Sequence, residues 1–249
     1  MEPSTHDEPI VSVTLGDSKV TLLGTAHVSK KSADTVAEMI DSGDYDAVAI
    51  ELCESRHTTL KDPDSLAKMD LFKVVREGKA PMVMASLALG AFQQRLADQF
   101  GIEPGAEMRV AMQKTDDLKL PLHLIDREVG TTLKRVYRAV PWWQRMSIFS
   151  GLIASAITHE KIEEKDIERL KEGDMLESTF QEFAQQNPNL YVPLIDERDE
   201  VMASHLYEIL QNEKPKNLLA VVGAGHLQGI ENHLNQLQIN KPSSENLKA

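Results

Sequence analysis

The opening of the chain predicts a β-hairpin from its pattern of hydrophobic and polar positions. Apolar and polar residues alternate over residues 11–16, as they do in a strand with one buried face. Gly16, Asp17 and Ser18 are typical turn residues, and residues 19–24 form a second run rich in β-forming side chains. Two such runs around a short turn predict a pair of antiparallel strands.

A helix and another strand are expected next. Ser29 suits the N-cap of a helix that reaches Ile40, and Gly43 can end this helix. Residues 47–50 then form a short apolar run that predicts a strand. This βαβ pattern predicts that the strands at residues 19–24 and 47–50 are parallel and joined by a right-handed crossover.

The rest of the chain contains long segments with a helical pattern and short apolar runs. They predict helices over residues 62–114 and 129–187, strands at residues 122–125 and 218–222, and a short helix after Gly225. The alternation predicts an α/β fold with a mainly parallel central sheet, the N-terminal hairpin and large helical insertions. We place this domain at residues 11–238, between flexible ends at residues 1–10 and 239–249.

Composition narrows the class of protein. The 249 residues carry a formal net charge of −12, which opposes binding to a phosphate backbone, so we expect no nucleic-acid partner. Cys53 is the single cysteine, which excludes an internal disulfide and any multi-cysteine metal site. The sequence has no run of about 18 apolar residues, and its acidic first residues do not resemble a signal peptide. We therefore expect a cytoplasmic protein without membrane association.

One segment is a candidate interaction surface. Trp142 and Trp143 are the only tryptophans, and they begin a largely apolar run that continues to Ala154. Aromatic residues in this position are typical of a membrane-interface helix, but Arg145 and several serines interrupt the run. We therefore expect this helix to be buried against protein, either in the core or between the two subunits of a homodimer.

Four predicted strands end in residues that can bind a metal ion or transfer a proton. His27 and His226 each complete a Gly-x-x-His motif after an apolar run, while Glu51 and Asp126 follow two other runs. Open α/β sheets bind ligands at the carboxyl ends of their strands. A helix cap would explain any one of these residues, but four together favour one crevice that holds a divalent metal ion or performs acid–base catalysis. The glycines would let a substrate or metal approach the backbone.

Charged residues lie near the same strand ends in the sequence. They are Arg56, Arg127, Arg135, Glu197 and Arg198. In the functional interpretation, the arginines balance the carboxylates of the crevice and offer planar donors to an anionic or carbonyl group of the substrate. Solvated helix ends would explain the same residues equally well. The six remaining histidines have no such placement, and we expect them at the surface or in packing contacts.

Other catalytic motifs are absent from the sequence. The glycines at 223, 225 and 229 suggest a dinucleotide loop, but the third comes one position late and no acidic residue follows at the customary distance. The chain also lacks a Walker loop, a His-Glu-x-x-His helix and a Gly-x-Ser-x-Gly elbow.

Five motifs in order resemble those of the TraB family, also called TraB/PrgY/GumN, over about residues 11–238. They are Gly24-Thr25-Ala26-His27-Val28-Ser29; Glu51-Leu52-Cys53 with Arg56; Asp126-Arg127-Glu128 followed by Thr131-Thr132-Leu133-Lys134-Arg135; Glu197-Arg198-Asp199 with Met202-Ala203; and Gly223-Ala224-Gly225-His226. The family is named for the shutdown of peptide sex-pheromone signalling in conjugative bacteria. It is similar to the Tiki metalloproteases and related to the erythromycin esterase/ChaN-like fold.

The resemblance implies a hydrolase that acts on a peptide or another small molecule. It implies His27 and His226 as ligands of a divalent ion such as zinc, manganese or cobalt, with Glu51 as a ligand or as the base. Erythromycin esterase relatives imply the alternative of a histidine base without a metal. A third alternative is a module that binds and sequesters a peptide in the same crevice without turnover.

Overall fold

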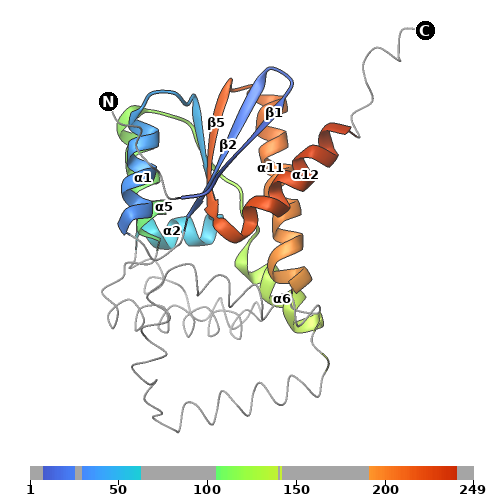
Figure 1. Cartoon of the computed structure of the whole chain (residues 1–249). Coiled ribbons are helices and arrows are strands. Elements are labelled where there is room, and N and C mark those ends of the chain that lie inside the picture. Colours follow the sequence, from blue (N-terminus) through green and yellow to red (C-terminus); the bar gives the residue numbers. More distant parts are fainter. Residues whose placement is uncertain (1–7, 26–29, 63–104, 140, 142–190, 240–249) are drawn as a thin grey trace, which may run out of the picture.

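The computed structural model describes residues 8–25, 30–62, 105–139, 141 and 191–239 (Figure 1). Its centre is a five-stranded sheet in the order β1-β2-β5-β3-β4. The strands are β1 (Ile10–Leu15), β2 (Ser18–Thr25), β3 (Ala47–Ile50), β4 (Leu122–Leu124) and β5 (Asn217–Gly223). Strand β1 is antiparallel to β2, whereas every other neighbouring pair is parallel. The predicted α/β fold with a mainly parallel sheet is therefore confirmed.

The predicted hairpin is formed by β1 and β2. Leu15 pairs with Ser18, so Gly16 and Asp17 make a two-residue turn. Gly16 has a φ of +64°, a conformation that costs little for glycine and that two-residue hairpin turns require.

The predicted βαβ unit is also present, but its two strands are not neighbours. Helix α1 (Lys30–Asp41) connects β2 to β3, and the two strands are parallel. Strand β5 lies between them, so that both Leu22 of β2 and Ala49 of β3 pair with Ala220. Gly43, with a φ of +75°, follows the end of α1 as expected. The strand nearest the C-terminus therefore occupies the middle of the sheet.

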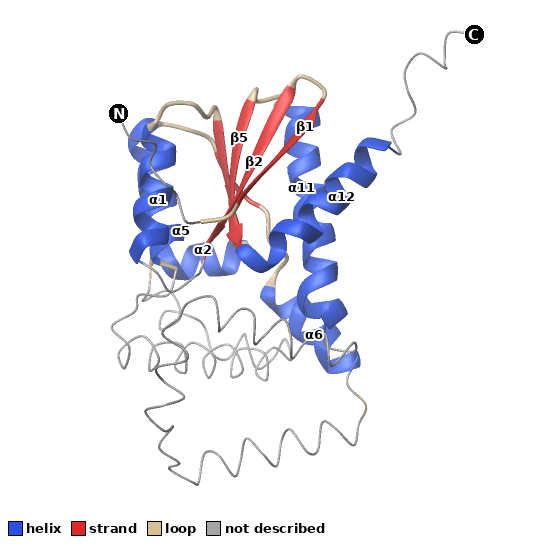
Figure 2. Cartoon of the chain, in the orientation of Figure 1, coloured by secondary structure: helices blue, strands red, loops and turns tan. Residues whose placement is uncertain are grey.

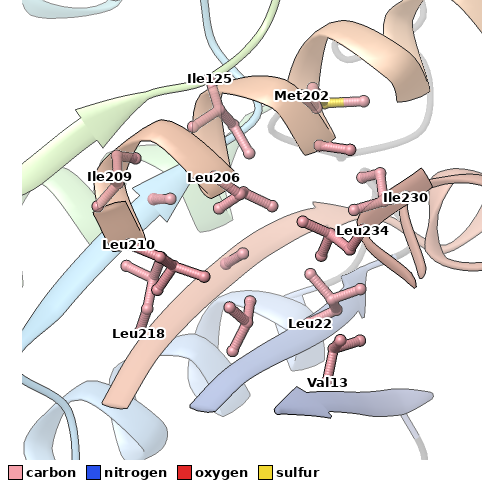
Figure 3. Close-up of a cluster of buried hydrophobic side chains, with 14 of the residues drawn as sticks. Val13, Leu22, Ile125, Met202, Leu206, Ile209, Leu210, Leu218, Ile230 and Leu234 are labelled. Carbon is pink, nitrogen blue, oxygen red and sulfur yellow. The ribbon is translucent and has the colours of Figure 1, made fainter. Parts of the chain in front are cut away.

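Helices cover both faces of the sheet (Figure 2). Helices α1 and α5 (Ala106–Leu118) pack on one face, and α11 (Glu197–Asn212) and α12 (Leu227–Ile239) pack on the other. Along β5, Leu218 and Ala220 join the α11/α12 core, which Figure 3 shows, whereas Leu219 joins the opposite core. Because both faces are covered, β5 is apolar at consecutive positions rather than at alternate ones.

Shorter elements connect this framework to the carboxyl edge of the sheet. They are α2 (Glu54–Lys61), α6 (Val129–Ala139), the π-helical segment η2 (Val192–Asp196) and the 3-10 turn η3 (Ala224–His226). The strand expected at residues 122–125 is β4, which ends one residue earlier, and the helical region expected from residue 129 begins with α6. No helix in the described ranges is long and apolar enough to cross a membrane.

Several predictions fall outside the described residues. These are the Ser29 N-cap, the helical insertion over residues 63–104, the helix from Trp142 to Ala154, the other helices expected between residues 142 and 187, and the terminal segments 1–7 and 240–249. Within the expected 62–114 helical region, α5 is described from Ala106 onward.

Candidate active site at the carboxyl edge of the sheet

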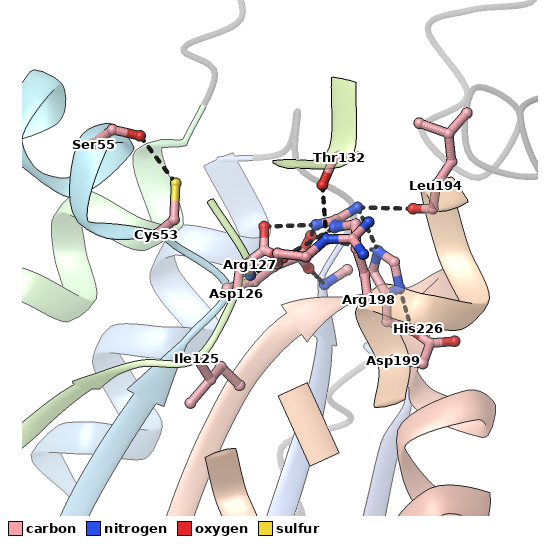
Figure 4. Close-up of polar contacts among 12 residues, drawn as sticks. Cys53, Ser55, Ile125, Asp126, Arg127, Thr132, Leu194, Arg198, Asp199 and His226 are labelled. Carbon is pink, nitrogen blue, oxygen red and sulfur yellow. Dashed lines mark hydrogen bonds and ion pairs between the residues drawn. The ribbon is translucent and has the colours of Figure 1, made fainter. Parts of the chain in front are cut away.

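Three of the four predicted strand-end residues lie in one buried cluster at this edge, and Figure 4 labels two of them, Asp126 and His226. Glu51 follows β3, Asp126 follows β4, and His226 ends η3 just after β5. Their side chains are only 5 to 6% exposed. The fourth residue, His27, lies outside the described residues. Parallel strand ends therefore converge as the sequence predicts, at least for these three residues.

Glu51 is fixed to the neighbouring strand by its backbone and by its side chain. Its N–H donates to the carbonyl of Val221 at 3.1 Å, and its Oε2 accepts the N–H of Gly223 at 2.7 Å. Its Oε1 lies 3.4 Å from Nε2 of His226. Because β3 and β5 are adjacent, the side chain of Glu51 reaches across the end of β5 to His226.

Arg198, in the first turn of α11, binds the two strand-end carboxylates together. Its Nε and Nη2 donate to the two carboxylate oxygens of Asp126 at 3.0 and 2.9 Å, a bidentate pair. Nη2 also donates to Glu51, and Nη1 lies 3.2 Å from Nε2 of His226. Burial alone would lower the pKa of Arg198, but the charges of Glu51 and Asp126 raise it. Arg198 is therefore a permanent cation at the centre of the cluster.

Asp199 orients the imidazole of His226 from the other side. Its Oδ1 lies 2.5 Å from Nδ1 of His226, so Nε2 faces Glu51. Burial alone would lower the pKa of His226, but the charge of Glu51 and the hydrogen bond with Asp199 raise it to about 10, against the opposing effect of Arg198. Burial raises the pKa of Asp199 itself. Both shifts keep a proton between the two residues.

Two glycines, Gly24 and Gly229, allow close packing at this edge. A Cβ on Gly229 would lie 1.9 Å from Oδ2 of Asp199, so only glycine leaves room for this carboxylate. A Cβ on Gly24 would lie 2.5 Å from Cδ1 of Leu227 and 3.0 Å from Cα of Ala224. The glycine of the first Gly-x-x-His motif thus accommodates the turn that carries the second.

Among the described residues, the cluster holds more negative than positive charge. Glu51, Asp126 and Asp199 contribute three carboxylates, which face Arg198 and a protonated His226. Charges with little access to water need partners, because desolvation penalises an uncompensated ion.

Arg127, Arg135 and Glu197 form a separate ion cluster beside this site. Arg127 donates to Glu197 at 2.7 Å, to Oγ1 of Thr132 at 3.1 Å and to the carbonyl of Pro193 at 2.7 Å. Arg135 donates to the same carboxylate and is 53% exposed. These contacts connect α6 to η2 and α11. Of the predicted arginines, Arg198 alone therefore joins the strand-end cluster in the described structure.

Arg56 is not brought into the cluster. It lies exposed on α2 and forms no ion pair with the residues that the structure describes. The carboxylate of Asp126 accepts from Arg198 and from the backbone N–H of Arg127, whereas Asp199 is the residue that orients His226.

Asp199 and Gly229 are the residues of this arrangement that the sequence analysis did not assign. A signal for each is present in the sequence. Asp199 follows Arg198 directly at a helix start, and Gly229 is the third glycine of a loop that does not fit a dinucleotide site. Within the described part of the chain, no group of three or more His, Cys, Asp or Glu side chains has the arrangement of a metal site.

The sequence of this chain is similar to those of known proteins. A sequence model of the TraB/PrgY/gumN family matches residues 9–241. An uncharacterised protein of Methanocaldococcus jannaschii is 34% identical over 229 residues, which are 90% of this chain and 55% of that protein. The TraB domain-containing proteins of human and mouse are 29% and 28% identical, each over 86% of this chain and 62% of their own length. The chain thus spans little more than half the length of these relatives.

Proposed function

This chain belongs to the TraB/PrgY/gumN family, and from that premise we propose that the strand-end cluster is the centre of a metal-dependent hydrolase of peptide or amide bonds. The observation that carries the proposal is the geometry of His226. Its Nε2 lies 3.4 Å from Oε1 of Glu51, while its Nδ1 is bound by Asp199 at 2.5 Å. Metal-binding histidines have this environment, because a carboxylate on one ring nitrogen directs the other toward the ion.

Two side chains of the cluster are of the kinds that bind a divalent cation. Imidazole and carboxylate are ligands for zinc, manganese and cobalt, and His226 and Glu51 present one of each side by side. Among the described charges, a divalent ion in place of the proton of His226 would, together with Arg198, balance the three carboxylates.

We propose His27 as a further ligand. Strand β2 lies beside β5, and Thr25 at its end pairs with Gly223. His27 is two residues beyond Thr25, and two residues of extended chain span at most about 7 Å. The covalent chain therefore lets His27 reach the edge at which His226 lies.

The side chains would divide the chemistry as follows. A bound ion would lower the pKa of a coordinated water molecule to about 7, as in known zinc sites. Glu51 would be either a third ligand or the base that accepts the proton, and Asp199 would hold His226 in position. Arg198 would balance Glu51 and Asp126 throughout, since its guanidinium is bound to both carboxylates. The family's association with pheromone shutdown agrees with a peptide substrate.

Calorimetric metal titration of the untagged protein tests this proposal. We expect wild type to bind one divalent ion, and His27→Ala and His226→Ala each to abolish binding. His233→Ala on α12 is the matched control and should bind normally, since His233 lies outside the cluster. Glu51→Gln should lose turnover and keep the ion if Glu51 is the base, or lose both if it is a ligand. Wild-type affinity in both His27→Ala and His226→Ala would reject the metal site.

The position of Arg198 favours a second candidate, a hydrolase that uses His226 as a base without a metal. The guanidinium already neutralises Glu51 and lies 3.2 Å from Nε2 of His226. Turnover of peptide substrates that survives exhaustive chelation, yet is lost in His226→Ala, would support this candidate. Peptide binding with no turnover under any metal condition would instead support a sequestering module.

We also propose a cytoplasmic location. It is supported by the single cysteine, Cys53, which is buried and free.

A further inference from the structure

A cavity of about 730 Å³ lies beside the proposed active site. Its lining comes from β4, from the start of α2 and from the C-terminal half of α11. Asp126 also lines it, and this is the carboxylate that Arg198 binds with two hydrogen bonds. The cavity is therefore continuous with the strand-end cluster. Figure 4 shows Cys53 at the start of α2 on the side of Asp126 away from His226.

Strand β4 presents backbone groups along this cavity that have no strand partner among the described residues. It is the last strand of the sheet and pairs only with β3 in the described structure. Val48 donates to the carbonyl of Pro121, and Ile125 donates to the carbonyl of Ile50. In a parallel ladder the amide groups of alternate residues point to opposite sides, so those of Leu122 and Leu124 point away from β3. Such an edge is a template for one more strand.

The lining of the cavity is acidic. It contains five carboxylate residues and neither lysine nor arginine; the acids are Glu54, Asp126, Glu128, Glu208 and Glu213. Asp126 is neutralised by Arg198, and Glu128 accepts a hydrogen bond from the uncharged Ser55 hydroxyl at 2.8 Å. Glu54 and Glu213 lie 3.8 and 3.3 Å from ring nitrogens of His57 and His123, which also line the cavity and carry a charge only when protonated. The lining therefore supplies no permanent cation to its other four carboxylates. An occupant with positive side chains would complement them.

We propose that this cavity binds an extended peptide segment carrying lysine or arginine, which adds to the edge of β4 and runs toward Asp126. Backbone hydrogen bonds to Leu122 and Leu124 would supply affinity, and the acidic walls would select the side chains. Successive side chains of a strand point to opposite sides. One set would face Glu208 on α11 and Glu213 directly after this helix, and the other would face Glu54 on α2. The inference rests on the proposed hydrolase only for the fate of the bound peptide.

Fluorescence anisotropy with four labelled hexapeptides tests the proposal on the full chain. The probes are an acetylated, amidated Val-Lys repeat, the same repeat with glutamate in place of lysine, and two forms of the Val-Lys repeat in which alternate amides are N-methylated, one for each register. We expect the lysine peptide to bind and the glutamate peptide to bind at least tenfold more weakly. N-methylation in one of its two registers should abolish binding, because it removes the donors that face β4.

Variants of the protein locate the site. Glu208→Gln with Glu213→Gln should weaken the lysine peptide about tenfold, since each exposed carboxylate contributes a few-fold. Glu200→Gln is the matched control, because Glu200 is an exposed acid on the same helix that does not line the cavity. Equal binding of the lysine and glutamate peptides, or no effect of either N-methylated register, would overturn the proposal. A concentration-dependent dimer that excludes the peptide would show instead that β4 pairs with a second copy.

The same experiment separates this inference from the proposed function. Binding measured with Glu51→Gln and with wild type reports the cavity alone, because it needs no turnover. Selective binding without hydrolysis would support the proposed peptide site and contradict the proposed hydrolase. If the double variant Glu208→Gln with Glu213→Gln hydrolyses peptides as fast as wild type, the proposed hydrolase is supported and the proposed peptide site is contradicted.

Discussion

Oδ1 of Asp199 lies 2.5 Å from Nδ1 of His226, and both side chains are at most 6% exposed. The pair joins the first turn of α11 to the turn after β5, so the position of a helix start determines where Nε2 of His226 points. A carboxylate that fixes an imidazole in this way contributes to function without touching substrate, as a positioning residue.

Asp199→Asn should therefore lower metal affinity or turnover about 10- to 100-fold while the fold remains. The amide keeps the shape of the carboxylate but loses its charge, so the pKa of His226 should fall. An NMR titration of the His226 ring would measure this change, which a purely structural role would not produce. Asp196→Asn is the control, because Asp196 is 56% exposed at the same helix start. A variant with wild-type activity and an unchanged His226 titration would contradict the assigned role.

Gly229→Ala should destabilise the protein even though alanine favours helices. Alanine gains about 1 kcal/mol in helix propensity over glycine. Its Cβ would, however, lie 1.9 Å from Oδ2 and 2.6 Å from Cγ of Asp199, so the carboxylate must move. We expect a net loss of about 1 to 2 kcal/mol in the free energy of unfolding, together with weaker metal binding. Urea denaturation measures the free energy of unfolding. The control is Gln228→Ala, a substitution at the exposed neighbouring residue. Unchanged stability would show that Asp199 can take another position.

Stability of the chelator-treated protein should fall between neutral and alkaline pH because of His226. Its pKa is raised from an ordinary value of about 6.5 to about 10 in the folded state. The folded protein then holds a proton more tightly than the unfolded chain does. The stabilisation is fully present below about pH 6.5 and is lost as the pH rises toward 10.

The difference between wild type and His226→Gln isolates this effect from the titration of lysines and tyrosines. Urea denaturation at intervals from pH 6 to pH 10 should show a steeper decline for wild type. Glu51→Gln should flatten the decline as well, because the charge of Glu51 is the main cause that raises the pKa of His226. Parallel profiles for all three proteins would mean that His226 is neutral in the folded state.

Arg127 and Arg135 both bind Glu197, but their removal should differ in effect. Arg127 is 11% exposed and makes hydrogen bonds to Glu197, Thr132 and the carbonyl of Pro193. Arg127→Ala leaves these acceptors poorly solvated and should cost about 2 to 3 kcal/mol. Arg135→Ala should change stability little, since solvent screens its exposed contact. Thermal denaturation of both variants checks the order, and equal losses would contradict it.

Local sequence determined most of the described helices and strands, and it determined which residues lie at the carboxyl ends of the strands. Turn residues at Gly16 and Asp17 specified the hairpin, and continuous apolar runs specified strands covered on both faces. The residue that follows an apolar strand lies at its carboxyl end in any parallel sheet. That geometric rule was enough to place Glu51, Asp126 and His226 at one edge before their contacts were known.

Tertiary structure alone decided which strands are neighbours and which charges meet. β5 separates β2 from β3, yet hydrophobic periodicity encodes only the faces of a strand and not the identity of its neighbours. Arg198 meets Glu51 across 147 residues of sequence, and Asp199 meets His226 across 27. Such pairs depend on where α11 begins relative to the ends of β3 and β5. The room that Gly229 leaves for Asp199 exists only once α11 and α12 pack together, because it is a distance between two helices and not a property of either segment.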